Sequence, residues 1–313
     1  MRSNPILLIA GPTASGKSAL ALALAQSEGG VVINADSMQI YRALPLLTAQ
    51  PDAAALAAAP HQLYGCLDPT RPCSAAQWCD LAREAITAAW AAGQLPIVTG
   101  GTGLYLESLR FGLSPIPEIP PAIREESRAL LAEIGNAAFH QRLAERDPVM
   151  AARLPPGDSQ RMVRAWEVIE ATGRSLESWQ GEPRQGGLSA CWLSVALQPP
   201  REVLRAACDG RFLAMVAAGA AEEAAAFLDR TLDPALPVMK TLGLRELGAA
   251  QRGEIPLAEA IATAQAATRA YAKRQMTWLR HRFDANLVID TQLSESLITP
   301  IFSKIRQFRL TPV

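Results

Sequence analysis

The chain has 313 residues, 49% of them hydrophobic, with 30 Lys and Arg balancing 30 Asp and Glu. The zero net charge argues against a protein coated with positive charge for nucleic acid, although a local basic groove remains compatible with it. No apolar run approaches the roughly 18 residues of a membrane span, and Met1–Pro5 is too short for a signal peptide, so we expect a cytoplasmic protein without a membrane partner.

The first predicted element is a short buried strand at residues 6–10, followed by a glycine-rich loop and an alanine- and leucine-rich helix at residues 19–25. The loop spacing matches G-x-x-x-x-G-K-[ST]. In this motif the backbone N–H groups and the lysine bind phosphate, and the hydroxyl of the last residue can bind a magnesium ion. The motif does not identify the ligand. The predicted phosphate site comprises Gly11, Pro12, Thr13, Ala14, Ser15, Gly16, Lys17 and Ser18, with Ser18 as the metal ligand.

Further strands are predicted at residues 31–36 and 95–99, with a helix at residues 77–92 before the second. This alternation predicts an α/β fold, a P-loop-type parallel sheet flanked by helices. Because ligands bind beyond the carboxyl ends of such strands, we expect residues 36–39 and the glycine turn at 100–103 to share a crevice with the phosphate loop.

Asp36 is the carboxylate at a strand end beside the phosphate loop. It could be a magnesium ligand, a general base, or the N-cap of a following helix. The glycine turn could equally serve only to start a helix close to the sheet. The cysteines and histidines add little, because the five Cys contain no Cys-x-x-Cys pair and the three His lie far apart.

A proline-rich stretch at residues 114–121 marks a boundary, after which residues 122–178 have a helical, arginine-rich pattern. A strand-like run at 191–197 then predicts a return to the sheet. We therefore expect a core domain of residues 1–116 and 190–313 and a helical insertion of residues 117–189. Further helices are expected at 201–229 and 257–282, with little signal from about Asp290.

Two helical stretches concentrate positive charge. Arg161 and Arg164 are three residues apart and share a helix face, as solvated arginines commonly do. Residues 269–282 contain no carboxylate, and their spacing puts Arg269, Lys273 and Arg280 on one stripe suited to a nucleic-acid backbone. The adjoining Tyr271 and Trp278 are expected to pack in the core.

The order of these motifs (GPTASGKS, INADSMQIYR, GGTGLY, DSQRMVRAWEV and RAYAKRQMTWLR) resembles that of the tRNA isopentenyltransferase family, the bacterial tRNA dimethylallyltransferases. The resemblance implies transfer of a dimethylallyl group from dimethylallyl diphosphate to N6 of the adenosine 3′ of the anticodon, with release of diphosphate and with Mg²⁺ as cofactor. It implies Asp36 as the base, with Thr102 and Arg211 as further catalytic residues.

By the same resemblance the insertion and the basic helix hold the tRNA anticodon stem-loop, and the enzyme is expected to act as a monomer. Leu244 departs from the family pattern, which has an aromatic residue there. The implied tRNA-binding residues are Asp36, Ser37, Met38, Gln39, Thr102, Arg124, Gln160, Arg161, Met162, Val163, Arg164, Lys240, Arg245, Lys273, Arg274 and Arg280.

Three alternatives remain. One is a non-catalytic RNA-binding switch that uses the phosphate loop only to sense nucleotide, against which Asp36 is the key evidence; the other two are enzymes. An adenylate isopentenyltransferase acting on free AMP or ATP would share the reaction, but it would not require the insertion or the basic helix. A small-molecule kinase using ATP would fit the phosphate loop alone.

Overall fold

The computed structural model describes residues 4–293 and 295–310 and divides the chain into two compact units. The sheet unit comprises Met1–Arg110 and Leu188–Val313, and the helical unit comprises Phe111–Gly187. Residues 1–3, where we expect no signal peptide, lie outside the described part of the chain.

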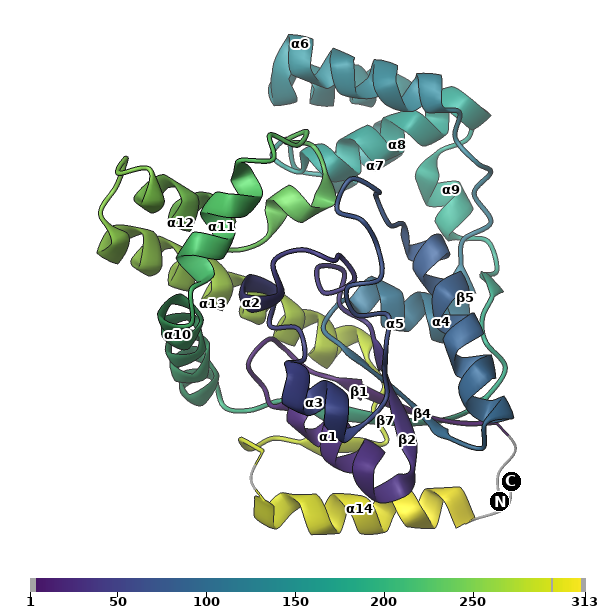
Figure 1. Ribbon diagram of the computed structural model, residues 1–313. Coiled ribbons are helices and arrows are strands. Elements are labelled where there is room, and N and C mark those ends of the chain that lie inside the picture. Colours follow the sequence, from purple (N-terminus) through teal and green to yellow (C-terminus); the bar gives the residue numbers. More distant parts are fainter. Residues whose placement is uncertain (1–3, 294, 311–313) are drawn as a thin grey trace. The chain divides into compact units, whose positions relative to one another are not determined.

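The sheet unit is built on a six-stranded sheet with the order β3-β2-β4-β1-β7-β8, in which every neighbouring pair is parallel (Figure 1). The predicted α/β fold with a parallel sheet is therefore confirmed. The strands are β1 (Pro5–Ala10), β2 (Gly30–Asn34), β3 (His61–Gln62), β4 (Leu95–Gly100), β7 (Cys191–Leu197) and β8 (Leu287–Ile289).

Both faces of the sheet are covered, because alternate side chains of the central strands enter different cores. Ile6 and Leu8 belong to a cluster with α4 (Ala75–Ala91), α5 (Gly103–Phe111) and the helices after β7, whereas Leu7 and Ile9 pack with α1 (Lys17–Glu28). The helices after β7 are α10 (Arg201–Ala217), α11 (Ala220–Leu228), a 3₁₀ turn (Pro237–Lys240), α12 (Leu244–Gln251) and α13 (Leu257–Arg282). The two short helices between β2 and β3 are α2 (Pro45–Thr48) and α3 (Ala53–Ala58).

Two helical segments differ from the sequence prediction. The single helix expected at residues 201–229 is divided into α10 and α11 at Gly219, whose φ of 101° is left-handed. The segment beyond Asp290, where little signal is expected, contains helix α14 (Glu295–Leu310), and its Ile301 and Ile305 are buried in the same cluster as α1.

The helical unit contains α6 (Pro121–Arg146), α7 (Pro148–Arg153), α8 (Ser159–Thr172) and α9 (Leu176–Gln180). It has a core of its own, with Phe139, Leu143 and Met162 fully buried in it. The segments that lead into and out of these helices pair as a short antiparallel ladder, β5 (Gly112–Leu113) with β6 (Gln185–Gly186). The strand β6 lies in the segment between α9 and β7.

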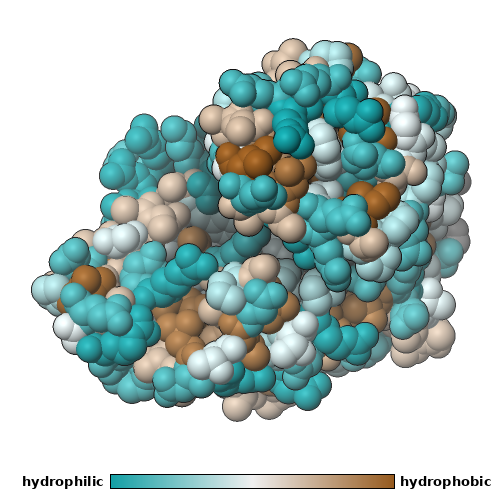
Figure 2. All heavy atoms as spheres, turned by 90° about the horizontal axis from the view of Figure 1, so that it is seen from above, coloured by the Kyte–Doolittle hydropathy of each residue, from teal (hydrophilic) through white to brown (hydrophobic). Residues whose placement is uncertain are grey.

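Hydrophilic residues predominate on the face shown in Figure 2, where apolar residues form small, separate groups. Within the described ranges, no helix combines the length and the apolar character needed to cross a bilayer.

Gly100, at the end of β4, is required by a close backbone approach. A Cβ atom there would lie 2.1 Å from the carbonyl oxygen of Ala35. We expect Gly100→Ala to lower the free energy of unfolding by about 1–3 kcal/mol or more, because the backbone must move to relieve the overlap. Gly210→Ala is the control, since its helical position is open and the substitution should stabilise by up to about 1 kcal/mol. Equal urea midpoints for the two variants would contradict this account.

Candidate functional site

The phosphate loop connects β1 to the first turn of α1, so its backbone lies at the positive end of the helix dipole. Ala14 (φ 63°) and Gly16 (φ 91°) both adopt left-handed conformations that bend the loop around its centre. The hydroxyl of Ser15 is buried and has no hydrogen-bond partner among the described residues. A buried hydroxyl without a partner is costly, and a phosphate oxygen bound in the loop would supply one.

Two cationic side chains form hydrogen bonds with residues of this loop. The Lys17 ammonium donates to the carbonyl oxygen of Pro12 at 3.3 Å, and the Arg211 guanidinium on α10 donates to the Thr13 hydroxyl. Burial of the ammonium lowers the pKa of Lys17 to about 8, with nearby Asp36 acting in the opposite direction and Arg211 adding to the decrease. Burial likewise lowers the pKa of Arg211, and Asp36 again opposes the change. The structure therefore brings Lys17, Arg211 and Asp36 together, although they lie in three separate segments.

Gln275, on α13, joins the phosphate loop to the glycine turn. Its side-chain oxygen accepts from the Thr13 N–H at 2.8 Å, and its amide nitrogen donates to the Gly101 carbonyl at 3.0 Å. The residue is only 7% exposed, so both bonds are shielded from water. The sequence analysis missed this role. A signal was present, since Gln275 is one helical turn from both Tyr271 and Trp278 and so lies on their stripe.

Asp36 follows β2 in a turn. Its N–H donates to the Asn34 side chain at 2.8 Å, and one of its carboxylate oxygens, Oδ1, accepts from the Met38 N–H at 2.9 Å. Because residues 37–40 form a turn, Asp36 is not a helix N-cap. For Oδ2, the other carboxylate oxygen, the described residues provide no hydrogen bond, so this oxygen is free to accept a proton or bind a cation.

Thr102 links the Asp36 turn to the glycine turn. Its hydroxyl accepts from the Ser37 N–H at 3.0 Å and donates to the Ser37 hydroxyl at 3.3 Å. Tyr271 is close to both turns: burial raises the pKa of its phenol, Asp36 raises it further, and a hydrogen bond with Thr102 lowers it. The three segments that follow β1, β2 and β4 therefore form one site, as the parallel sheet predicts.

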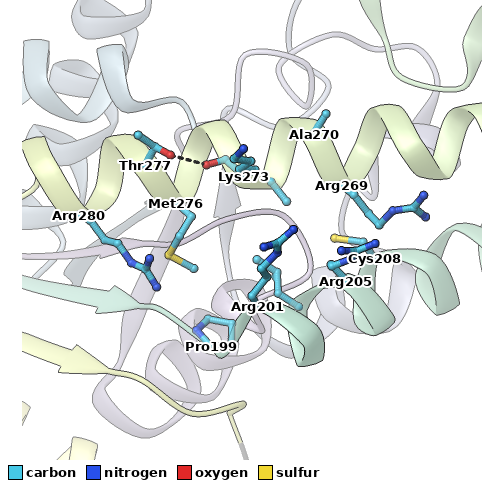
Figure 3. Close-up of a pocket in the computed structure, with 12 residues that line it drawn as sticks. Pro199, Arg201, Arg205, Cys208, Arg269, Ala270, Lys273, Met276, Thr277 and Arg280 are labelled. Atoms are coloured by element: carbon cyan, nitrogen blue, oxygen red, sulfur yellow. Dashed lines mark hydrogen bonds between the residues drawn. The ribbon is translucent and has the colours of Figure 1, made fainter.

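Helix α13 presents two different stripes. Tyr271, Gln275 and Trp278 face the site, with the Trp278 ring against Gly103. The second stripe, Arg269, Lys273 and Arg280, lines a cavity of about 410 Å³ between α13 and α10 (Figure 3). From α10 the same cavity receives Arg201 and Arg205, which the sequence analysis did not single out. The basic stripe predicted on α13 is thus one side of a cluster of basic residues, and α10 contributes the other side.

The predicted tRNA-binding residues outside this centre differ in exposure. Gln160 and Arg161 are exposed on α8 in the helical unit, and Lys240 and Arg245 are exposed in the sheet unit. Met162 and Val163 are buried in the core of the helical unit, so they position their neighbours instead of offering side chains to a ligand.

Two further residues that the sequence analysis singled out have structural roles. The Gln39 amide nitrogen donates to the carbonyl oxygens of Thr48 and Ala49, both at 2.8 Å, and so fastens a neighbouring loop. Leu244, the departure from the expected aromatic residue, is fully buried in the main core at the start of α12. Lys240 and Arg245 flank it at the surface.

A metal ion at this site would be coordinated by a protein hydroxyl oxygen and by oxygens of the bound phosphate compound. Within residues 4–293 and 295–310, no three His, Cys, Asp or Glu side chains are grouped as a metal site. Ser18, at the start of α1, is exposed, and Mg²⁺ commonly uses few protein ligands together with phosphate oxygens and water. The donor set thus fits a magnesium ion that arrives with a phosphate ligand.

A sequence profile described as IPP transferase matches residues 39–282, and one described as isopentenyl transferase matches residues 4–62. The tRNA dimethylallyltransferase of Paramagnetospirillum magneticum is 60% identical over 309 residues, which cover 99% of this chain and 98% of the relative. The crystal structure of a Bacillus halodurans tRNA isopentenylpyrophosphate transferase aligns with TM-score 0.69 at 32% identity, covering 98% of this chain and 97% of that one. A eukaryotic dimethylallyltransferase acting on tRNA aligns with TM-score 0.80 at 25% identity, covering 97% and 80%.

The pKa of Lys17 predicts how anion binding depends on pH. A bound diphosphate stabilises the charged ammonium, so above pH 8 binding requires proton uptake and the affinity falls. Lys17→Arg stays charged throughout. We expect the ratio of the wild-type Kd for inorganic diphosphate to that of Lys17→Arg to rise about tenfold between pH 7 and pH 9 by calorimetry. The ligand's own ionisation cancels in this ratio, and a ratio independent of pH would refute the assignment.

Proposed function

The chain belongs to the IPP transferase family, the family of the tRNA dimethylallyltransferases, and from this premise we propose the roles of its residues in prenyl transfer to tRNA. The protein is a prenyltransferase. We propose that it transfers a dimethylallyl group from dimethylallyl diphosphate to N6 of the adenosine 3′ of the anticodon and releases diphosphate. A monomer in the cytoplasm, the compartment of the tRNA substrate, suffices for this reaction.

The observation that carries the proposal is the Asp36 carboxylate, which has one oxygen without a hydrogen bond from the described residues and lies beside two partly buried cations. Burial lowers the pKa of Lys17 and of Arg211, and the charge of Asp36 opposes the decrease in both cases, so the carboxylate lies near both cations. Transfer between a diphosphate ester and an amine needs cations at the leaving group and a base at the nucleophile. Lys17 and Arg211 are our candidates for the cations, and Asp36 is our candidate for the base.

In the proposed reaction, the bond between the allylic carbon and the diphosphate oxygen breaks while the adenine N6–carbon bond forms. Lys17, Arg211 and the loop N–H groups stabilise the negative charge that accumulates on the leaving oxygens. The N6 amine is a poor nucleophile because its lone pair is delocalised into the ring. Oδ2 of Asp36 accepts the N6 proton as the amine attacks, and Thr102 holds the Asp36 turn in place.

Mg²⁺ would be held by the Ser18 hydroxyl and the diphosphate oxygens. When bound, it supplies additional positive charge at the leaving group.

The tRNA is proposed to contact both units. In the sheet unit the candidate contacts are Lys240, Arg245, Lys273, Arg274 and Arg280, all of which are exposed. In the helical unit they are Arg124, Gln160, Arg161 and Arg164. The exposed Arg161 pairs with Asp158 at 3.7 Å, whereas Arg164 donates a hydrogen bond to the buried Glu167 carboxylate at 3.4 Å. A base taken out of the anticodon loop loses stacking energy of a few kcal/mol, which contacts of this kind would offset.

Asp36→Asn tests the base. An amide oxygen of the same shape cannot accept the N6 proton at neutral pH, so we expect the single-turnover transfer rate to fall about 10²–10⁴-fold. The Kd for tRNA should stay within about threefold of wild type, because the turn geometry is retained. Transfer is measured by mass analysis of nucleosides from tRNA incubated with dimethylallyl diphosphate and Mg²⁺.

Asp68→Asn is the matched control, because Asp68 is an exposed carboxylate that likewise caps a turn, at Thr70. Its transfer rate should equal that of wild type. A loss of less than tenfold in Asp36→Asn would remove Asp36 from the reaction. Prenylation of AMP in place of tRNA would identify an adenylate isopentenyltransferase, and ATP turnover without prenyl transfer would identify a kinase.

Charge reversal on the helical unit tests its contribution to RNA binding. The Arg124→Glu/Arg161→Glu double variant should raise the Kd for an anticodon stem-loop at least about tenfold, because two phosphate contacts become repulsive. The control is Arg128→Glu/Arg142→Glu, which changes the same charge at two exposed positions of α6. Equal affinity of the two double variants in a filter-binding assay would show that this unit does not bind RNA through Arg124 and Arg161.

A further inference from the structure

The cavity between α10 and α13 holds a concentration of positive charge that the proposed reaction does not use in full. Arg201 and Arg205 reach it from α10, opposite Arg269, Lys273 and Arg280 on α13 (Figure 3). Five of its twelve lining residues are cationic, and within the described part of the chain none of them is a carboxylate.

Most of this charge is not neutralised locally. Arg269 forms an ion pair with Asp209. Arg201 is 3.8 Å from Glu202, but both side chains are more than three-quarters exposed, so this pair is weak. Among the described residues, Arg205, Lys273 and Arg280 have no carboxylate within ion-pair distance. Like charges gathered in a recess favour an anion there, since low-dielectric walls focus their field.

The cavity lies next to the phosphate loop. Cys208 lines it and is fully buried, and the Cys208 thiol approaches the Thr13 carbonyl oxygen at 3.8 Å. Arg211, one turn further along α10, contacts the Thr13 hydroxyl. Arg201, Arg205 and Cys208 share one face of α10 by their spacing. One buried side chain therefore separates the cavity from the loop.

The size and walls of the cavity suit a small amphiphilic anion. Its volume of about 410 Å³ is in the range of small-molecule sites. Leu204, Ala272 and Met276 provide apolar surface beside the cations. A diphosphate bearing a short hydrocarbon chain matches both features, whereas an RNA backbone would leave the apolar wall without a partner.

We propose that this cavity is a collecting site for small organic diphosphates, which it holds next to the phosphate loop, and that Arg201 and Arg205 speed their capture. The inference rests on the proposed function, because the captured molecule is the allylic diphosphate. Clefts of one charge sign raise association rates by about 10–10³-fold at low ionic strength. Capture is thus faster than Lys17 and Arg211 alone would achieve.

The test uses the α10 arginines because Lys273 and Arg280 are shared with the proposed RNA surface. In the Arg201→Glu/Arg205→Glu double variant, kcat/KM for dimethylallyl diphosphate should fall about tenfold or more at low salt. The deficit should shrink as salt is raised, because screening weakens steering. The single-turnover rate at saturating diphosphate and the Kd for tRNA should both match wild type.

The control is Arg71→Glu/Arg252→Glu, an equal change of charge at exposed positions that do not line the cavity. Arg201→Gln/Arg205→Gln, which removes charge without reversing it, provides the measurement if the glutamate variant has a lowered Tm. An unchanged kcat/KM relative to the control would overturn the proposal. A tenfold weaker Kd for tRNA with kcat/KM unchanged would also overturn it and assign the arginines to RNA. If wild-type protein transfers no prenyl group, the proposed function fails instead.

Discussion

The side-chain amide of Gln275 joins the phosphate loop to the glycine turn after β4. It accepts from the Thr13 N–H and donates to the Gly101 carbonyl, and no other type of side chain of this length offers one acceptor and one donor in that arrangement. Both bonds are partly buried, and replacing either partner would leave a polar group without its hydrogen bond. The residue sits on α13, so this helix cannot move without moving the loop that binds phosphate. The position of the phosphate loop is therefore coupled to the position of α13.

The parallel sheet supplies the other constraint. The strands β1, β2 and β4 are neighbours with a common direction, so the segments that leave them emerge at one edge. Gly100 allows the chain to pass against Ala35, and Gly103 allows the Trp278 ring to pack on the next turn. Small residues at these places let the three segments approach one another, so that Thr102 bonds to Ser37 and Gln275 bonds to both Thr13 and Gly101. The residues proposed for catalysis thus lie at the edge of a sheet instead of on long loops.

The sequence was sufficient for features that depend on local spacing. The phosphate loop, the strand and helix alternation and the full extent of α13 follow from motif spacing and periodicity. Arg280 and Arg282 place cations at the negative end of the α13 dipole. Features that depend on pairing between distant segments were missed. In the sequence, Gln275 is one polar residue in a basic run, and its role is visible only once the fold places Thr13 beside it. Similarly, Arg201 and Arg205 can be recognised as part of a basic cluster only once α10 lies opposite α13. Leu244 could be recognised as unusual, but its burial at the start of α12 depends on the folded core.

The order of the strands also determines when the sheet can be completed during synthesis. The central strand β1 pairs with β4 on one side and with β7 on the other, and the whole helical unit is made between β4 and β7. The helical unit has its own core, and the β5–β6 ladder closes it where the chain enters and leaves. On the ribosome, one edge of β1 therefore waits unpaired while the helical unit emerges and folds. Pairing of β7 with β1, across so many intervening residues, is then expected to be slow, and β8 can join the sheet only after it.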